Sequence, residues 1–319
     1  MLSLILAAAL SGPVSTPVVL TAEPAPLHGT LLTPEGPTRA AALVIAGSGP
    51  TDRDGNSPLG VSASSYRLLA EGLAAHGVAT VRADKRGIGE SASPGMAEAD
   101  LRFTDYSNDA RAWAAETARL TGQPCAWLIG HSEGALVALA AVAGGDDAVC
   151  GLVLLSGAGR PIGAVLREQL ANAPEPLRGQ AVAILAELEA GRPVTEVPPQ
   201  LAALFRPSVQ PYMISWLPLD PAGMVAAYDG PVMIGQGSTD IQVGLTDANA
   251  LAAKQLAEVE GKIRRLQALR TELQRMVDAG CQGRAGDCRV LESLADHRHC
   301  EADHASATPA VVIYPKVGA

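Results

Sequence analysis

Short apolar runs alternate with longer amphipathic stretches along most of the chain. The runs are rich in Val, Leu, Ile and Ala and have the length of buried strands, at 41–47, 77–84, 124–130, 150–157 and 230–237. Several stretches between them have helical periodicity, at 66–76, 104–120 and 134–143. This alternation predicts a doubly wound, mostly parallel α/β sheet. Ligands of such sheets bind beyond the carboxyl ends of the strands, so functional residues are expected in the loops there.

The alternation is interrupted at 160–228, where ten prolines divide the chain into short helical pieces. This segment is predicted to be a helical cap over the sheet. Its apolar side chains either line a substrate pocket or hold the cap together, and the sequence leaves both open. They are Leu201, Leu204, Phe205, Met213, Ile214, Trp216 and Leu217.

Composition narrows the function classes. The chain has 24 Lys and Arg against 33 Asp and Glu, a formal charge of −9, which argues against a nucleic-acid-binding surface. No apolar run approaches the ~20 residues of a membrane helix, which argues against an integral membrane protein. Residues 1–10, within an N-terminal extension at 1–26, fit either a signal peptide or a buried first strand. A periplasmic or secreted location and a cytoplasmic one therefore both stay open.

Two cysteines, Cys125 and Cys150, each lie at the start of a predicted strand. If those strands are parallel neighbours, the two thiols lie at the same edge of the sheet. Their spacing then fits either a disulfide or two buried free thiols.

A nucleophile-elbow motif follows the third of these predicted strands. Gly130-His131-Ser132-Glu133-Gly134 matches G-x-S-x-G between a predicted strand and a predicted helix. Ser132 is the candidate nucleophile, and the backbone N–H of Glu133 is a candidate oxyanion donor. His131 is predicted to be a structural histidine packed under the turn, because neighbouring side chains on such a turn point apart.

Two other strand ends carry related motifs. The stretch GSGPTDRDGN covers 47–56 and DKRGIGES covers 84–91, and with GHSEG they resemble bacterial esterases of the α/β-hydrolase superfamily. The resemblance covers roughly 27–253. It implies a serine hydrolase acting on small acyl esters without a cofactor, with a second oxyanion donor in the backbone N–H of Ser48.

The same resemblance implies further roles at two places. Asp240, after the strand at 230–237, holds the position of the family's catalytic acid, which would orient the imidazole of a Ser-His-Asp triad. Asp52, Arg53 and Asp54 are expected to order the oxyanion loop through a local ion pair.

The triad histidine has no counterpart at its expected position. The last predicted strand lies at 310–314, within a final hydrolase segment at 306–319, and no histidine follows it. A substitute base from His297, His299 or His304 is not favoured. We therefore expect a truncated hydrolase with an impaired triad, since an unassisted serine hydroxyl stays protonated.

Residues 254–305 have a different character. Apolar residues occupy heptad positions across 254–279, followed by Cys281, Cys288 and Cys300 among histidines, ligands that suit Zn²⁺ or another thiophilic metal. This segment resembles the dimerisation helix and metal loop of MerR-family regulators, although their DNA-binding winged helix has no counterpart here.

The resulting organisation is a hydrolase core interrupted by two segments. The core covers 27–159 and 229–253, the cap covers 160–228, and the regulator-like segment covers 254–305. Removing that segment would nearly restore the family's interval between the acid and the histidine position. The alternative function is a non-catalytic, metal-binding protein that forms a homodimer through 254–279 and does not bind DNA.

Overall fold

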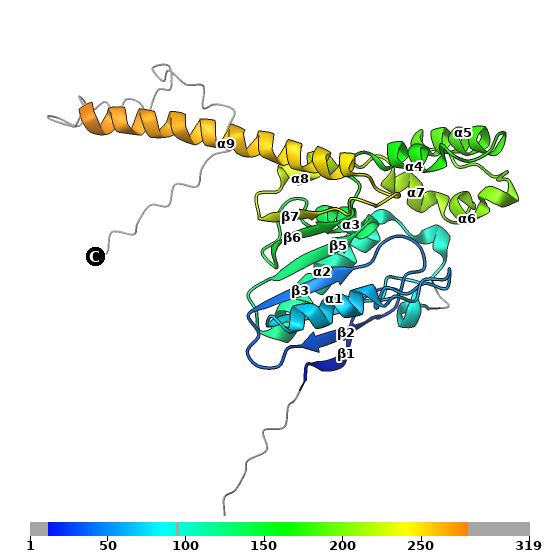
Figure 1. The fold of residues 1–319 in the computed structure, drawn as a ribbon, viewed down its shortest axis with the longest axis horizontal. Coiled ribbons are helices and arrows are strands. Elements are labelled where there is room, and N and C mark those ends of the chain that lie inside the picture. The colour runs from blue at the N-terminus through cyan, green and yellow to red at the C-terminus, as the bar shows by residue number, and fades with distance from the viewer. Residues whose placement is uncertain (1–11, 94–95, 280–319) are drawn as a thin grey trace, which may run out of the picture. The chain divides into compact units, whose positions relative to one another are not determined.

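The computed structural model describes residues 12–93 and 96–279 (Figure 1). The chain divides into two compact units, 1–255 and 256–319. The first contains a seven-stranded sheet with helices, and the described part of the second is the end of helix α9 (Leu245–Ala279). Among the described residues, no helix combines the length and the apolarity needed to span a bilayer.

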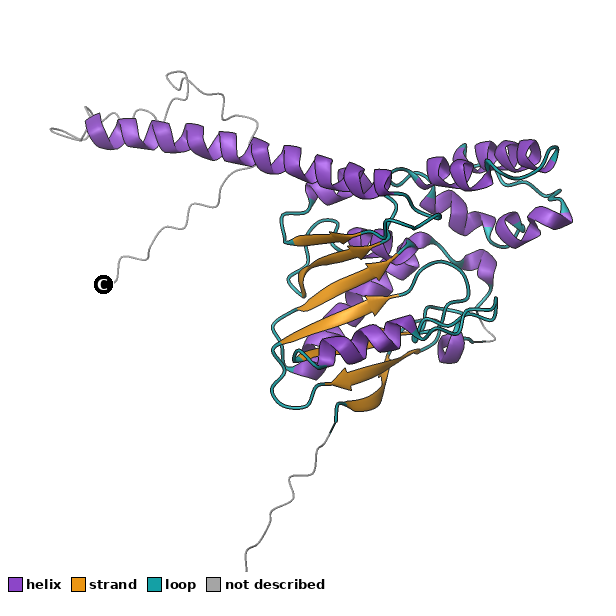
Figure 2. Ribbon diagram, in the orientation of Figure 1, coloured by secondary structure: helices purple, strands orange, loops and turns teal. Residues whose placement is uncertain are grey.

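The sheet is mixed and mostly parallel, in the order β1-β2-β4-β3-β5-β6-β7 (Figure 2). Strand β2 pairs antiparallel with β1 on one side and with β4 on the other. Every other neighbouring pair is parallel. The bounds are β1 (Val14–Leu20), β2 (Leu27–Thr33), β3 (Ala40–Ile45), β4 (Val78–Ala83), β5 (Ala126–His131), β6 (Val149–Leu155) and β7 (Val232–Gly235). The predicted α/β class and its five parallel strands are confirmed.

The antiparallel hairpin β1–β2 was not predicted from the sequence. Strand β1 is an edge strand, and Val18 is its one buried residue. Pro17 lies within the strand and cannot donate a ladder hydrogen bond. The strand therefore lacks the continuous apolar run that marks the central strands.

Helices cover both faces of the sheet because side chains alternate along each strand. Leu43 and Ile45 of β3 face a core shared with α2 and α3, whereas Ala42 and Val44 pack with Tyr66 of α1 on the opposite face. The helix bounds are α1 (Ser65–Ala74), α2 (Phe103–Thr121) and α3 (Glu133–Ala141). This is the layered arrangement of a doubly wound fold.

Between β6 and β7 the described chain forms a series of short helices joined by loops, and it contains no strand. Helices α4 to α7 gather on the side toward which the arrows of β3 and β5 point (Figure 1). The helices are α4 (Ile162–Leu170), α5 (Leu177–Glu189), η3 (Pro199–Leu201), α6 (Ala202–Phe205), α7 (Gln210–Trp216) and α8 (Pro221–Ala227).

The apolar side chains of these helices hold them onto the core. Seven apolar residues between 201 and 217 were candidates for lining a pocket or for packing the cap. Five of them are at most 9% exposed and belong to the same core cluster as α2 and α3, and the other two pack against it. The five are Leu201, Phe205, Met213, Trp216 and Leu217. Of the two alternatives that the sequence left open, the structure favours the packing role.

The beginning of α9 is fixed to the first unit by a buried carboxylate. Asp247 is fully buried, accepts a hydrogen bond from the N–H of Gly159 at 2.9 Å and pairs with Arg160 at 2.8 Å. Leu251, one turn later, lies in the main core. The helix starts at Leu245 and runs without a break past residue 254, where the sequence placed the start of a separate segment.

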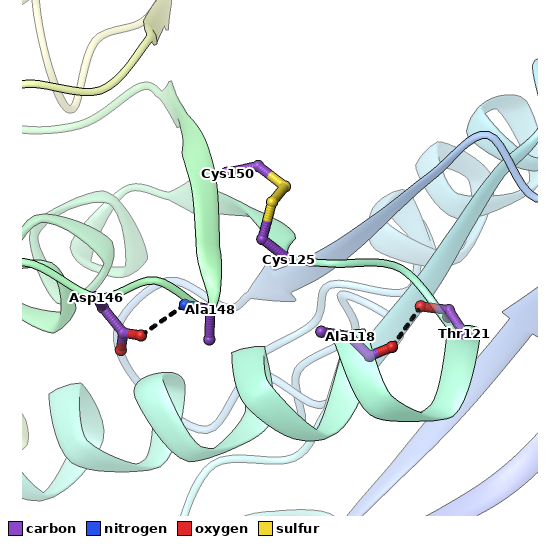
Figure 3. Close-up of a disulfide and its surroundings, with 6 residues drawn as sticks. All are labelled: Ala118, Thr121, Cys125, Asp146, Ala148 and Cys150. Atoms are coloured by element: carbon purple, nitrogen blue, oxygen red, sulfur yellow. Dashed lines mark hydrogen bonds between the residues drawn. A yellow bond between two sulfur atoms is a disulfide. The ribbon is translucent and has the colours of Figure 1, made fainter. Parts of the chain in front are cut away.

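Cys125 and Cys150 form a disulfide (Figure 3). Cys125 directly precedes β5 and Cys150 lies in β6, so the bond joins neighbouring parallel strands with their Cα atoms 5.2 Å apart. The structure thus decides between the disulfide and the two free thiols that the sequence left open.

Replacing Cys125 by Ser should lower the free energy of unfolding by about 3 kcal/mol, because the unfolded chain would regain the entropy of a closed loop of this length. Urea unfolding under non-reducing conditions measures the change. The unmutated protein unfolded after reduction with dithiothreitol is the control and should show the same loss of stability. Equal stabilities of Cys125→Ser and the unmutated protein would contradict the disulfide.

Candidate active site

Three neighbouring parallel strands bring their carboxyl ends to one edge of the sheet. The N–H of Ser132, after β5, donates to the carbonyl of Leu155 at the end of β6, at 2.8 Å. The N–H of Ser156, after β6, donates to the carbonyl of Gly235 at the end of β7, also at 2.8 Å. These hydrogen bonds align the loop that carries Ser132 with the loop that leads to Asp240.

Ser132 adopts a backbone conformation that is unfavourable for a side chain. Its φ is 55° and its ψ is −119°, at the turn between β5 and α3. The flanking glycines allow that turn to be tight. A Cβ on Gly130 would overlap the backbone of Gly134, and a Cβ on Gly134 would overlap the carbonyl of Ile45 in β3. The motif therefore forms the sharp strand-to-helix turn that the sequence predicted.

The loop after β3 runs directly beside this turn. A Cβ built on Gly47 would lie 3.2 Å from the Cβ of Ser132 and 3.3 Å from the carbonyl oxygen of His131, so the two loops pass close to each other. The Gly47 N–H donates to the Tyr66 hydroxyl at 3.1 Å, and the Gly47 carbonyl accepts from Lys85 Nζ at 2.5 Å. The next residue, Ser48, is exposed. The loop thus brings the Ser48 peptide close to the candidate nucleophile.

The prediction of a local ion pair among Asp52, Arg53 and Asp54 is wrong. Arg53 instead pairs with Asp84, at 2.7 Å, and with Glu90, both in the segment after β4. Those carboxylates raise the pKa of Arg53, against the effect of its burial. The charges of this loop are therefore satisfied across the sheet edge, because neighbouring side chains on the chain point in different directions.

The other two residues of that triplet have separate partners. Asp54 pairs with Arg82 of β4 at 2.9 Å. Asp52 accepts hydrogen bonds from the N–H groups of Asp54 and Asn56, at 2.9 and 2.8 Å, and so shapes the turn itself.

Asp240 is held as a carboxylate by donors on several sides. It accepts hydrogen bonds from the N–H groups of Gln242 and Val243, at 2.9 and 3.1 Å, and from the Gln236 amide at 3.0 Å. Partial burial raises the pKa of Asp240, but these bonds and one from Ser156 outweigh it, so the pKa lies below its usual value. The carboxylate is ionised at neutral pH and near enough to His131 to act on that ring electrostatically.

Comparison with known proteins assigns the chain to a family. A sequence profile described as "Serine aminopeptidase, S33" matches residues 59–268, well over half of the chain. The chain belongs to the S33 serine aminopeptidase family. The α/β-hydrolase superfamily inferred from the three motifs is thereby confirmed, whereas no comparison bears on the MerR-like segment.

Solved structures show the same fold at low sequence identity. Est1E from Butyrivibrio proteoclasticus is 19% identical, with 77% of this chain and 85% of that chain covered and a TM-score of 0.51. Proline iminopeptidase from Mycobacterium smegmatis is 14% identical, with 75% and 87% covered and a TM-score of 0.51. Acylaminoacyl peptidase from Pyrococcus horikoshii is 12% identical, with a TM-score of 0.51; 78% of this chain is covered, but only 36% of that chain. No curated protein sequence matches significantly.

His131 is a structural residue of this S33 fold, as predicted. Its Nδ1 is joined to the Tyr66 hydroxyl by a hydrogen bond of 2.8 Å, and the two rings meet edge to face. Burial lowers the pKa of His131, and the charge of Asp240 offsets part of that shift. The imidazole is therefore neutral at pH 7.

Three predicted ligands and three histidines lie outside the described residues. They are Cys281, Cys288, Cys300, His297, His299 and His304. Within 12–93 and 96–279, no cluster of His, Cys, Asp and Glu is arranged to hold a metal ion. The thiophilic metal site therefore stays a prediction.

One feature of this S33 site was missed by reasoning from the sequence. Only the backbone N–H of Glu133 was considered, yet its carboxylate is buried and bonded to Tyr212 of α7 and Lys85 of the loop after β4. A charged residue at the first position of a helix that is otherwise apolar was the available signal, because such a charge needs a buried partner.

Replacing His131 by Gln should reduce the loss of stability on acidification. The folded-state pKa of His131 lies below 6.5, so the unfolded chain binds more protons, and stability falls as pH decreases below 6.5. The variant lacks this titration and should show a shallower decline in urea midpoint as the pH falls below 6.5. The exposed His76→Gln is the control, and identical pH profiles for wild type and His131→Gln would contradict the assignment.

Proposed function

We propose that the protein is a serine hydrolase that cleaves small acyl esters through an acyl-enzyme on Ser132. The observation that carries this proposal is the strained Ser132 turn in contact with the Gly47 loop. In that arrangement a carbonyl bonded to Oγ would lie beside the backbone donors of both loops. Membership of the S33 family supports hydrolytic chemistry. The likeness of the fold to Est1E would not support it alone, because one fold can carry many functions.

The proposed reaction has two steps and needs no cofactor. Ser132 Oγ attacks the ester carbonyl, the oxyanion is stabilised by the N–H groups of Ser48 and Glu133, and the alcohol leaves with the hydroxyl proton. Water then attacks the acyl-enzyme and releases the carboxylic acid. Asp240 would serve as the acid that orients a triad imidazole, as its low pKa and its position after β7 suit it to do.

We further propose that turnover is slow, because Asp240 lacks an imidazole partner among the described residues. The hydrogen bonds to Asp240 there come from amide groups and a serine hydroxyl. His131 is committed to Tyr66 through Nδ1 and sits on the turn beside the nucleophile. Without a general base, catalysis would rest on the oxyanion donors and on substrate binding.

Hydrolysis of p-nitrophenyl butyrate should be slow and should depend on Ser132. Ser132→Ala should reduce the rate to the buffer background, since it removes the acylated atom. Ser64→Ala, at another serine with a positive φ (49°), is the matched control and should keep wild-type activity. Equal rates for Ser132→Ala and wild type would refute the proposed hydrolase.

A second candidate function rests on the surface of α9. From residue 256 onward, the heptad positions of this helix carry large apolar side chains that are exposed. Leu266 is 64% exposed and Val277 is 73% exposed. We propose that this face pairs with a second copy of the chain, as the resemblance to MerR-family dimerisation helices implies. The heptad residues are Leu256, Val259, Ile263, Leu266, Leu273 and Val277. The associated metal site would use Cys281, Cys288 and Cys300.

Sedimentation velocity should show a dimer that dissociates in the double variant Leu266→Lys with Leu273→Lys, because two charges would then enter the apolar seam. Leu68→Lys, at an exposed leucine of α1, controls for the loss of surface leucines. A wild-type monomer, or a dimer that the double variant retains, would contradict the proposed pairing. Zinc retained after dialysis and lost in Cys281→Ser with Cys288→Ser would support the metal site.

A further inference from the structure

Lys85 is a buried ammonium group held between two loops and a helix. Its side chain is 9% exposed, and its Nζ donates to the Gly47 carbonyl at 2.5 Å and lies 3.4 Å from Glu133 Oε2. The Nζ also lies over the ring of Tyr106, 5.5 Å from its centre. Since an unpaired buried charge is costly, the ammonium is confined to these partners.

The bond from Lys85 to Gly47 fixes the orientation of the Ser48 N–H. The Gly47 carbonyl and the Ser48 N–H belong to one peptide unit, which is planar and trans, so the two groups point in opposite directions. An ammonium on the carbonyl side therefore leaves the N–H directed away from Lys85. It also polarises the peptide, which strengthens the N–H as a donor. The preceding peptide is fixed separately, through the Gly47 N–H bonded to Tyr66.

Glu133 connects this peptide to the helices between β6 and β7. Its Oε1 accepts a hydrogen bond from the Tyr212 hydroxyl at 2.7 Å, while its Oε2 faces Lys85. Tyr212 lies on α7, whose Ser215 accepts a hydrogen bond from the N–H of Phe103 at the start of α2. Glu133 therefore couples its own backbone N–H, next to Ser132, to the loop that carries the other donor.

We propose that Lys85 is a positioning residue that orients the Ser48 N–H toward the oxyanion, and that Glu133 and Tyr212 hold Lys85 in place. The inference rests on the proposed hydrolase function. It assigns to the α7 helix a role in the oxyanion site in addition to its packing. In a site without a general base, catalysis rests on the oxyanion donors and on substrate binding, so a change at Lys85 should alter the acylation rate directly.

The test is single-turnover acylation by p-nitrophenyl butyrate. The release of p-nitrophenol measures the acylation rate, which is determined over a range of substrate concentrations. Lys85→Met should lower the limiting acylation rate by roughly 10²- to 10³-fold, as the loss of one oxyanion donor does, with the half-saturating concentration unchanged. Lys85→Arg, which keeps a cationic donor, should recover most of the rate. Lys254→Met, at an exposed lysine of α9, is the matched control.

Tyr212→Phe provides an independent variant in case Lys85→Met fails to fold. It removes one hydroxyl and should slow acylation about fivefold, the effect of a single net hydrogen bond. An unchanged limiting rate in whichever of the two variants folds would overturn the role of Lys85. Acylation that persists in Ser132→Ala would instead overturn the proposed function, so the two failures are distinguishable.

Discussion

The site depends on one close backbone approach, between the first turn of α3 and the ends of β3 and β5. At Gly130 and Gly134 the backbones are so near that neither position has room for a Cβ. That approach forces the intervening Ser132 into an unfavourable conformation and brings the Gly47 loop against it. The strain is sustained because strands on both sides of β5 fix the ends of the turn.

A set of buried polar contacts surrounds this turn and satisfies its charges. Lys85 and Glu133 compensate each other within the protein, with Tyr212 completing the carboxylate's hydrogen bonds. The Tyr66 hydroxyl accepts a hydrogen bond from the Gly47 N–H and is also hydrogen-bonded to Nδ1 of His131. The Gly47 N–H, the Gly47 carbonyl and the Ser132 N–H thus each have a hydrogen-bond partner, which is the kind of preorganisation that oxyanion stabilisation requires. Among the described residues, the hydrogen bonds to Asp240 come from amide N–H groups and a serine hydroxyl.

The α9 helix belongs to two different environments. Its first turns are anchored by Asp247 and Leu251 in the first unit, and its later turns carry an exposed apolar face. The S33 profile ends at residue 268, within this helix. The boundary placed at residue 254 from the heptad pattern falls inside a continuous helix and next to the division between the two compact units, which lies after residue 255.

The sequence by itself determined the α/β class, the central strands and the turn around Ser132, because apolar runs, helical periodicity and a G-x-S-x-G spacing are local properties. It could not determine the edge hairpin, whose side chains are mostly exposed, or the Cys125–Cys150 bond, which depends on strand neighbours. It also misassigned the partners of Arg53, which lie after β4. The pairing of Lys85 with Glu133 was decided only by tertiary structure, since buried charges are satisfied by whichever groups the fold brings within reach.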